Sequence, residues 1–119
     1  MPTVLITGAS RGIGRVLADQ YEDDGWNVIS TCRSPQNLNE MALDITNVRQ
    51  VNRIAHVLSD TPIDVLINNA GVIGQRNAII GNIDYEQWEE TFRINTLGPI
   101  RVAEALAENV AASEKKVIV

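Results

Sequence analysis

Cysteine, aromatic residues and positive charge are all scarce in this sequence. Its single cysteine, Cys32, has no partner for an internal disulfide, and nothing else points to an oxidising compartment. The 15 acidic side chains outnumber the 10 lysines and arginines, and the net charge of -5 argues against general electrostatic binding of nucleic acid. A local basic pocket for a phosphorylated small molecule is still compatible with this charge.

Long apolar runs are absent as well. No stretch approaches the ~18 residues that a membrane span needs, and the start of the chain lacks the basic region and apolar run of a signal peptide. His56 has no second histidine or ligand-spaced partner, so we expect a surface residue there and no metal site. These absences predict a soluble, cytoplasmic protein that binds neither nucleic acid nor membranes.

The composition, 45% hydrophobic and 21% charged, is typical of a globular chain, and 119 residues fit one domain spanning residues 1–119. Short apolar runs alternate with helical patterns. The candidate strands are Thr3–Ile6, Asn27–Ser30, Glu40–Leu43, Asp64–Ile67 and Lys116–Val119. This alternation predicts an α/β fold, a Rossmann-like, doubly wound parallel sheet that binds ligands at the carboxyl ends of its strands.

Three helices are expected between these strands. The second has Thr46 available as its N-cap, and the third begins near Asp84, with Gln87 at the capping-box spacing. The third helix runs toward residue 109 with an interruption at the pair Gly98–Pro99. The apolar stripes of the first two helices are Ile13, Val16, Leu17 and Tyr21, and Val48, Val51, Ala55 and Leu58.

The first candidate strand runs into the segment TGASRGIG, which contains Gly8, Gly12 and Gly14. Glycine accepts a positive φ angle and lets backbone N–H groups come close to a phosphate. The start of the following helix adds a partial positive charge. A plain glycine-rich turn is the alternative, but the strand before it and the amphipathic helix after it favour a phosphate site.

The spacing of these glycines matches a Thr-Gly-x-x-x-Gly-x-Gly turn, and the sequence resembles the classical short-chain dehydrogenase/reductase family. Three further segments match motifs of that family in order: LDIT (Leu43–Thr46), NNAG (Asn68–Gly71) and RIN (Arg93–Asn95). The segments TCRS and LDIT most resemble the corresponding segments of carbonyl-reductase-type members. The resemblance covers the whole chain, which corresponds to the N-terminal half of a typical member. It implies the strand order 3-2-1-4-5, truncated after the fifth strand.

The resemblance also implies a nicotinamide dinucleotide cofactor and a small carbonyl or alcohol substrate. Asp44 is expected against the adenine, although it has an equally good alternative as the acid that precedes the following helix. Asn68 is expected to bond neighbouring strands. The cofactor-binding residues implied are Gly8, Ser10, Arg11, Gly12, Ile13, Gly14, Arg33, Asp44, Ile45, Asn69, Ala70 and Gly71.

The choice of cofactor depends on the residues about 20 positions beyond the glycines, where a carboxylate would bind the ribose hydroxyls of NAD. Residues 28–39 contain no Asp or Glu, and Arg33 stands 19 residues after Gly14. A guanidinium there would pair with a 2′-phosphate, and Arg11 could reach the same group. A solvated arginine at a strand end is the alternative for Arg33. Together the two arginines predict NADP rather than NAD.

Asn95 is the one candidate catalytic residue of this chain. Pro99, four residues later, has no N–H to donate to the carbonyl of Asn95, which would be left free inside the helix. In the family, the equivalent carbonyl holds a water of the proton relay. The alternative is a helix that simply breaks at Gly98–Pro99.

The other catalytic groups of the family, a Ser and a Tyr-x-x-x-Lys, have no match here, because Tyr21 and Tyr85 are followed at the fourth position by Gly25 and Glu89. We therefore expect dinucleotide binding without turnover by this chain alone. A non-catalytic binding module and an oligomerising fragment are the alternatives. The exposed edge strand expected at residues 116–119 favours a homo-oligomer.

Overall fold

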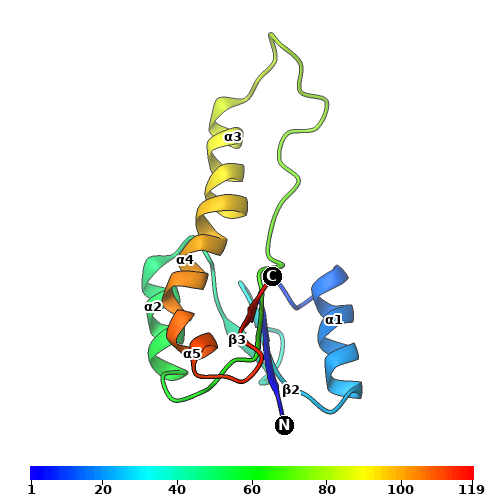
Figure 1. The fold of residues 1–119 in the computed structure, drawn as a ribbon. Coiled ribbons are helices and arrows are strands. Elements are labelled where there is room, and N and C mark those ends of the chain that lie inside the picture. The colour runs from blue at the N-terminus through cyan, green and yellow to red at the C-terminus, as the bar shows by residue number, and fades with distance from the viewer.

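The computed structural model describes all 119 residues and contains one five-stranded parallel sheet (Figure 1). The strand order is β3-β2-β1-β4-β5, which confirms the doubly wound, Rossmann-like fold. Each predicted strand agrees with the observed one within two residues at either end. The strands are β1 (Thr3–Ile6), β2 (Asn27–Cys32), β3 (Glu40–Ala42), β4 (Val65–Ile67) and β5 (Val117–Ile118).

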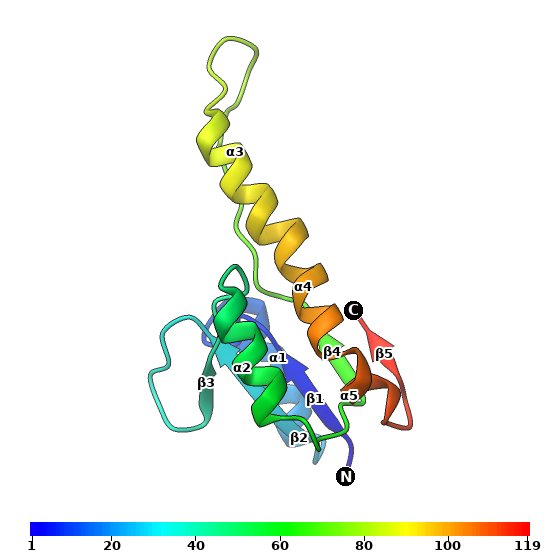
Figure 2. The same ribbon diagram turned by 90° about the vertical axis from the view of Figure 1, so that its left-hand side faces the viewer.

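Helices cover the sheet unequally. In Figure 1, α1 lies on one face, and α2, α4 and α5 lie on the other, whereas α3 projects beyond the sheet with the loop before it. Figure 2 shows the same arm from the side, and the molecule is accordingly elongated, 52 × 26 × 25 Å. The helices are α1 (Gly12–Asp23), α2 (Val48–Val57), α3 (Tyr85–Phe92), the π-helix η1 (Arg93–Leu97), α4 (Gly98–Ala105) and α5 (Ala107–Ala111).

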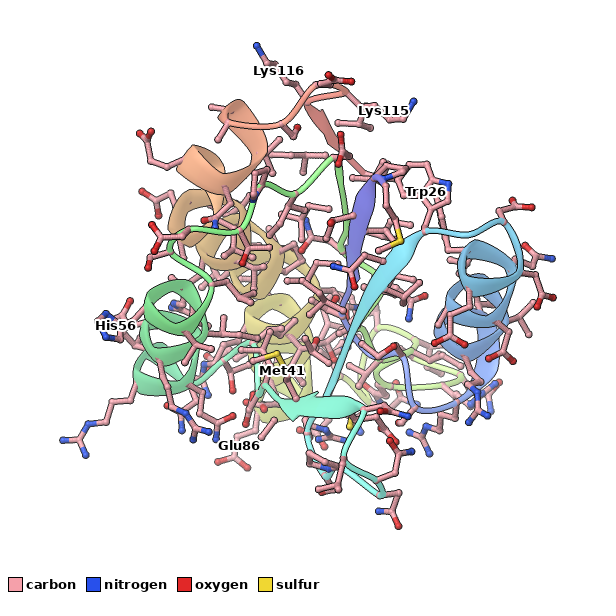
Figure 3. All side chains as sticks on the ribbon, turned by 90° about the horizontal axis from the view of Figure 1, so that it is seen from below. Trp26, Met41, His56, Glu86, Lys115 and Lys116 are labelled. Atoms are coloured by element: carbon pink, nitrogen blue, oxygen red, sulfur yellow. The ribbon has the colours of Figure 1, made fainter.

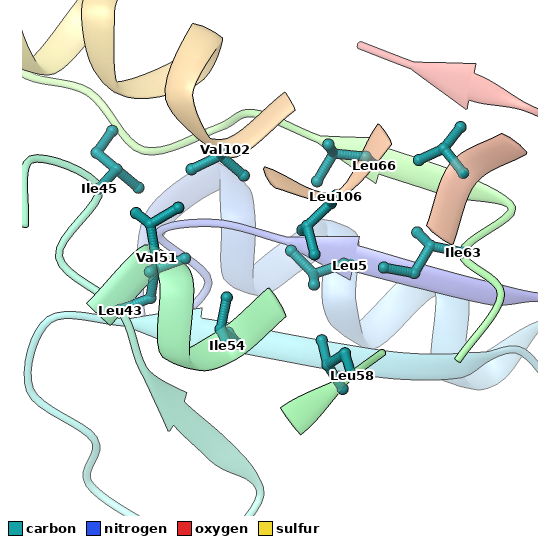
Figure 4. Close-up of a cluster of buried hydrophobic side chains, with 11 residues drawn as sticks. Leu5, Leu43, Ile45, Val51, Ile54, Leu58, Ile63, Leu66, Val102 and Leu106 are labelled. Carbon is teal, nitrogen blue, oxygen red and sulfur yellow. The ribbon is translucent and has the colours of Figure 1, made fainter. Parts of the chain in front are cut away.

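Strand β1 is buried on both faces, which explains its unbroken apolar run. Leu5 faces the helices α2, α4 and α5, whereas its neighbours Val4 and Ile6 face α1, because side chains alternate along a strand. The larger of the two clusters is shown in Figure 4 and consists of Leu5, Leu43, Ile45, Val51, Ile54, Leu58, Ile63, Leu66, Val102, Leu106 and Val110.

Helix α1 does not use its whole predicted stripe. Leu17 and Tyr21 pack against the smaller cluster, as predicted, but Ile13 is 75% exposed and Val16 is 55% exposed. The buried positions of α1 are the small residues Gly14 and Ala18. Gly14 and Ala18 lie one turn apart on the same face of α1, and this face packs against the sheet. The side chains of Ile13 and Val16 therefore stay in solvent.

The second helix has a different cap from the one predicted. The side chain of Asn47, not Thr46, accepts the N–H of Gln50, at 3.1 Å. The hydroxyl of Thr46 instead donates to Oδ1 of Asp44 at 2.7 Å, so it is not available to the helix. His56 lies exposed on the outer side of α2, as predicted (Figure 3).

The third helix begins as predicted, with Asp84 accepting the N–H of Gln87 at 3.1 Å. In a capping box the side chain of Gln87 would accept the N–H of Asp84 in return, but here that N–H donates to Oε1 of Gln75. The interruption lies directly before the predicted pair Gly98–Pro99, at which α4 begins. It is the π-helical turn η1, and the N–H of Gly98 bonds to the carbonyl of Arg93. A Cβ at Gly98 would lie 2.6 Å from Cδ1 of Ile45, so a side chain there would prevent this close packing.

A buried carboxylate joins three strands at the end of the sheet opposite the glycine turn. Asp64 accepts the N–H of Thr3 at 2.9 Å through Oδ2 and the N–H of Lys115 at 3.4 Å through Oδ1. The Nζ atom of Lys115 also lies 5.8 Å from the ring centroid of Trp26 (Figure 3). The N–H donors, that of Thr3 foremost, hold the pKa of Asp64 below its ordinary value.

This lowered pKa gives folding a pH dependence of known sign. Because the carboxylate is favoured in the folded state, Asp64 stabilises the fold above its unfolded pKa, and the stabilisation is lost as the pH falls through the folded pKa. We expect Asp64→Asn to lower the free energy of unfolding at pH 7 and to differ less from the parent at pH 3, which lies below the ordinary pKa of 3.8. Urea unfolding at both pH values measures this, and an equal difference at pH 3 would contradict it.

Candidate functional site

A pocket of about 620 Å³ opens at the carboxyl ends of the strands, where the fold predicts a ligand site. It contains every predicted cofactor-binding residue except Ile13 and Gly14. Asn95 lines a neighbouring hollow of about 350 Å³, which shares Asn69–Val72 with the first. The larger pocket is lined by Gly8, Ser10, Arg11, Gly12, Cys32, Arg33, Ser34, Gln36, Leu43, Asp44, Ile45, Thr46, Asn69, Ala70, Gly71, Val72, Glu90 and Ile94.

The glycine turn has the conformation that its sequence predicts. Gly8 and Gly12 have φ angles of +64° and +58°, a region that favours glycine. A Cβ at Gly8 would lie 2.9 Å from the Cα of Ala70, whereas one at Gly12 would meet no atom within 4 Å. Gly8 is therefore required for packing against the segment after β4, and Gly12 leaves open space beside the pocket.

The helix that follows this turn starts without a side-chain cap. Asn47 and Asp84 cap α2 and α3, but no side chain bonds the first N–H groups of α1, whose first turn also lacks an acid. Helix starts normally satisfy these donors with side chains, water or a ligand. The uncapped end of a 12-residue helix beside a pocket suits an anionic group such as a phosphate.

A network around Thr7 holds the turn against the strand beside it. The buried Oγ1 of Thr7 accepts the N–H groups of Asn69 and Ala70, both at 3.0 Å. In return, Nδ2 of Asn69 donates to the carbonyls of Thr7 and Gly8, both at 3.0 Å. Asn68 contributes only its N–H, to the carbonyl of Val119 at 2.8 Å. This bond joins the ends of β4 and β5, as expected of Asn68, whereas Asn69 joins the end of β4 to the glycine turn.

Gly14 lies behind this network rather than on the pocket. Its Cβ position would collide with the carbonyl oxygen of Gly8 and with Nδ2 of Asn69. Ile13, the other predicted residue that does not line the pocket, points its side chain largely into solvent. Both residues can reach a ligand only through their backbone N–H groups in the first turn of α1.

The two predicted arginines, Arg11 and Arg33, line the pocket, are exposed and form no salt bridge. The pKa of Asp44 is lowered chiefly by the hydroxyl of Thr46, with a smaller contribution from the charge of Arg33. Oδ1 of Asp44 also accepts the N–H of Thr46 at 2.9 Å. The pocket thus combines two free guanidinium groups with two carboxylates that already have partners: Asp44 is hydrogen-bonded to Thr46, and Glu90 pairs with Arg93 at 2.9 Å.

Asn95 fixes the segment that follows β4. Its Nδ2 donates to the carbonyl of Val72 at 2.7 Å, and its Oδ1 accepts the N–H of Val72 at 2.8 Å. A Cβ at Gly71 would lie 3.1 Å from this Oδ1, so Gly71 allows the contact. Pro99 offers no N–H to the carbonyl of Asn95, and the residues before it are π-helical. The proton-relay role of that carbonyl remains a prediction.

Several lining residues were not anticipated. Cys32 is buried with its Sγ 2.9 Å from Oε2 of Glu40, and burial first, then Glu40, raises its pKa to about 11. Four of the others directly adjoin predicted residues in the sequence, so proximity to those residues was an available signal: Ser34, Leu43, Thr46 and Val72. Gln36 lies three residues beyond Arg33. Glu90 comes from α3 and Ile94 from η1, and no local pattern indicates either residue.

No group of three or more His, Cys, Asp and Glu side chains is arranged to hold a metal ion. None of the helices has both the length and the apolar character needed to cross a bilayer.

Comparison with known proteins identifies the family. Retinol dehydrogenase 5 from Mus musculus is 32% identical, over 97% of this chain and 41% of its own length. L-xylulose reductase from Caenorhabditis elegans is 31% identical, over 89% of this chain and 47% of its own length. A carbonyl reductase from Pseudomonas aeruginosa in complex with NADP superposes with a TM-score of 0.83 at 34% identity, covering 92% of this chain and 56% of that one.

The chain thus spans about half the length of these relatives. The family model for short chain dehydrogenases matches residues 2–119. The glycine turn, the strand order and the pocket at the strand ends agree with that match. The chain belongs to the short-chain dehydrogenase family.

Proposed function

We propose that residues 1–119 form the NADP(H)-binding domain of a short-chain oxidoreductase. The observation that carries the proposal is the pocket in which an uncapped helix start lies near two unpaired arginines. Phosphates bind at such helix starts, and a guanidinium pairs with a 2′-phosphate. The P. aeruginosa carbonyl reductase, which matches most of this chain, binds NADP in its crystal structure.

Each part of the pocket has a proposed role. The first turn of α1 holds the diphosphate through the N–H groups of Gly12, Ile13 and Gly14, with Ser10 beside it. Arg11 and Arg33 hold the 2′-phosphate, and Asp44 and Ile45 lie against the adenine. The ribose near the nicotinamide lies along Asn69–Gly71, which lead into the hollow of Asn95.

The reaction proposed for the intact protein is reversible hydride transfer between NADP(H) and a small carbonyl or alcohol. The bound cofactor supplies the hydride. Asn95 positions the segment after β4 beside the reacting end, and its carbonyl would hold a water for proton transfer. Because residues 1–119 contain no Tyr-x-x-x-Lys, we propose that they bind the cofactor without turning over substrate.

This missing motif also supports a second candidate, a binding module that responds to NADP(H) without catalysis. The oxidoreductase and the binding module differ in whether the polypeptide in the cell contains the catalytic Ser and a Tyr-x-x-x-Lys motif. Mass spectrometry of the native protein distinguishes them. We further propose a cytoplasmic protein that forms homo-oligomers. The apolar edge strand supports the latter, because Val117, Ile118 and Val119 are 40%, 47% and 67% exposed.

Titration with NADPH and with NADH tests the proposal. Calorimetry is the better readout than tryptophan fluorescence, because Trp26 and Trp88 line neither hollow. We expect saturable binding that prefers NADPH. Arg33→Asp should weaken NADPH binding about tenfold to a hundredfold, because a charge-assisted contact to phosphate is replaced by repulsion.

Arg53→Asp is the matched control for the Arg33 variant, because Arg53 is exposed on α2 and lies outside the pocket. It changes the net charge equally and should leave NADPH affinity within about twofold. NADH binding should not fall in either variant. Equal losses from both variants, or no binding by the parent chain, would overturn the proposed cofactor.

A further inference from the structure

The loop between β2 and β3, residues 33–39, forms one wall of the pocket through Arg33, Ser34 and Gln36. All seven of its residues are exposed, so packing does not fix its shape. Polar contacts must do so, and the side chain of Asn37 in this loop bonds to one side chain outside the pocket, Glu40, which also contacts Cys32 at the end of β2.

Both carboxylate oxygens of Glu40 are bound. Oε2 lies 2.9 Å from the Sγ of Cys32, the last residue of β2, and Oε1 accepts Nδ2 of Asn37 at 2.7 Å. Asn37 in turn accepts the N–H of Asn39 at 2.9 Å through its own side chain. Glu40 therefore joins the strand end directly before Arg33 to the middle of the loop that follows it.

The direction of the Cys32 contact is chemically defined. With its pKa raised to about 11, the thiol is protonated at neutral pH and donates its hydrogen to the carboxylate. No thiolate charge therefore faces the pocket, and the Glu40 charge is turned toward its two donors. The wall beside Arg33 is left without a free anion.

We propose that Glu40 is a positioning residue for recognition of the 2′-phosphate. It holds residues 33–39 in the shape that keeps the Arg33 side chain on the pocket, and it keeps its own charge off that surface. This inference rests on the proposed NADP(H) binding and adds a residue that does not itself touch the ligand. Glu40 would thereby increase the preference of the pocket for NADPH, which carries the 2′-phosphate, over NADH, which lacks it.

Two opposite effects make the inference testable. Removal of a carboxylate near the site would by itself favour binding of a phosphate, because it removes a repulsion. Glu40 lies outside the pocket, however, and salt weakens such a repulsion over a distance of about 8 to 10 Å. Loss of the loop anchor would instead weaken the phosphate contact of Arg33. Because a guanidinium–phosphate contact depends strongly on geometry, we expect the second effect to exceed the first.

The experiment is calorimetric titration of the 119-residue chain and its variants with NADPH and NADH. Glu40→Ala should raise the Kd for NADPH about tenfold and change that for NADH less than about twofold. Asn37→Ala removes the contact to Glu40 and the bond from Asn39 but leaves the Cys32–Glu40 contact, so it should give a smaller loss of the same preference. Glu22→Ala, an exposed acid at the end of α1, controls for charge.

A ratio of NADPH to NADH affinity that stays at the parent value in both Glu40→Ala and Asn37→Ala would overturn the inference. A higher NADPH affinity would also overturn it, since charge alone would then decide. If the parent chain binds neither nucleotide, the proposed function itself fails, and the inference fails with it. A merely structural role would weaken both nucleotides in parallel, which this ratio detects.

Discussion

Replacement of Thr7 by valine is expected to lower the free energy of unfolding by about 1 to 3 kcal/mol, although the two side chains have nearly the same shape. The hydroxyl of Thr7 is the acceptor for the N–H groups of Asn69 and Ala70. Valine would leave the N–H of Ala70 without a partner, and the N–H of Asn69 with only the carbonyl of Ile67 at 3.1 Å, around a side chain that is 1% exposed. Each unpaired buried donor costs about 1 to 3 kcal/mol.

Thr7→Ser is the matched control, because it keeps the acceptor and removes one methyl group. Its cost should be about 1 kcal/mol, the value for burying one such group. Chemical unfolding of both variants measures the difference. Thr7→Val should also weaken NADPH binding, since Asn69 and Ala70 line the pocket. A serine variant as unstable as the valine variant would show that the methyl group, not the hydroxyl, holds the site.

The parts of the fold that the sequence predicted are those fixed by local pattern. The run around Leu5 predicts a strand buried on both faces, and the glycines after it predict the turn at its end. Strand ends in a parallel sheet meet at one edge, so Arg33 and Asp44 could be assigned to the pocket from their positions alone.

Features decided by contacts between distant segments were not predictable in the same way. Thr46 and Asn47 are both N-cap residues by type, Asn being the stronger, and Asp44 removes Thr46 from the choice by binding its hydroxyl. Ile13 continues an apolar stripe, but the line of contact of α1 follows its small residues instead. Glu90 reaches the pocket only because the projecting helix passes over it, and no spacing in the sequence encodes that path.

The same reasoning applies to the pair Asn68–Asn69, of which Asn69 holds the glycine turn. Only the amide of Asn69 bonds the carbonyls of Thr7 and Gly8, whereas Asn68 bonds the end of β5 through its N–H. The sequence shows two identical residues and gives no register by which to choose. The structure places Asn69 against the turn, and its Nδ2 occupies the space that a side chain at Gly14 would need.

Gly14→Ala is therefore expected to have an effect opposite to the one that helix propensity predicts. Alanine within a helix is normally about 1 kcal/mol more stable than glycine. At Gly14 the added methyl group would collide with the carbonyl oxygen of Gly8 and with Nδ2 of Asn69. We expect a loss of about 1 to 3 kcal/mol in the free energy of unfolding, the usual cost of overpacking.

The collision should also reduce NADPH affinity by about tenfold or more, because α1 must move away from the turn and take its first N–H groups with it. Gln20→Ala, at an exposed position of the same helix, should change stability by less than about 0.5 kcal/mol and leave binding unaffected. Chemical unfolding and calorimetric titration measure both quantities. A Gly14→Ala variant more stable than the parent would mean that α1 can shift without cost, and the tight contact between turn, helix and Asn69 would then not be what shapes the phosphate end of the pocket.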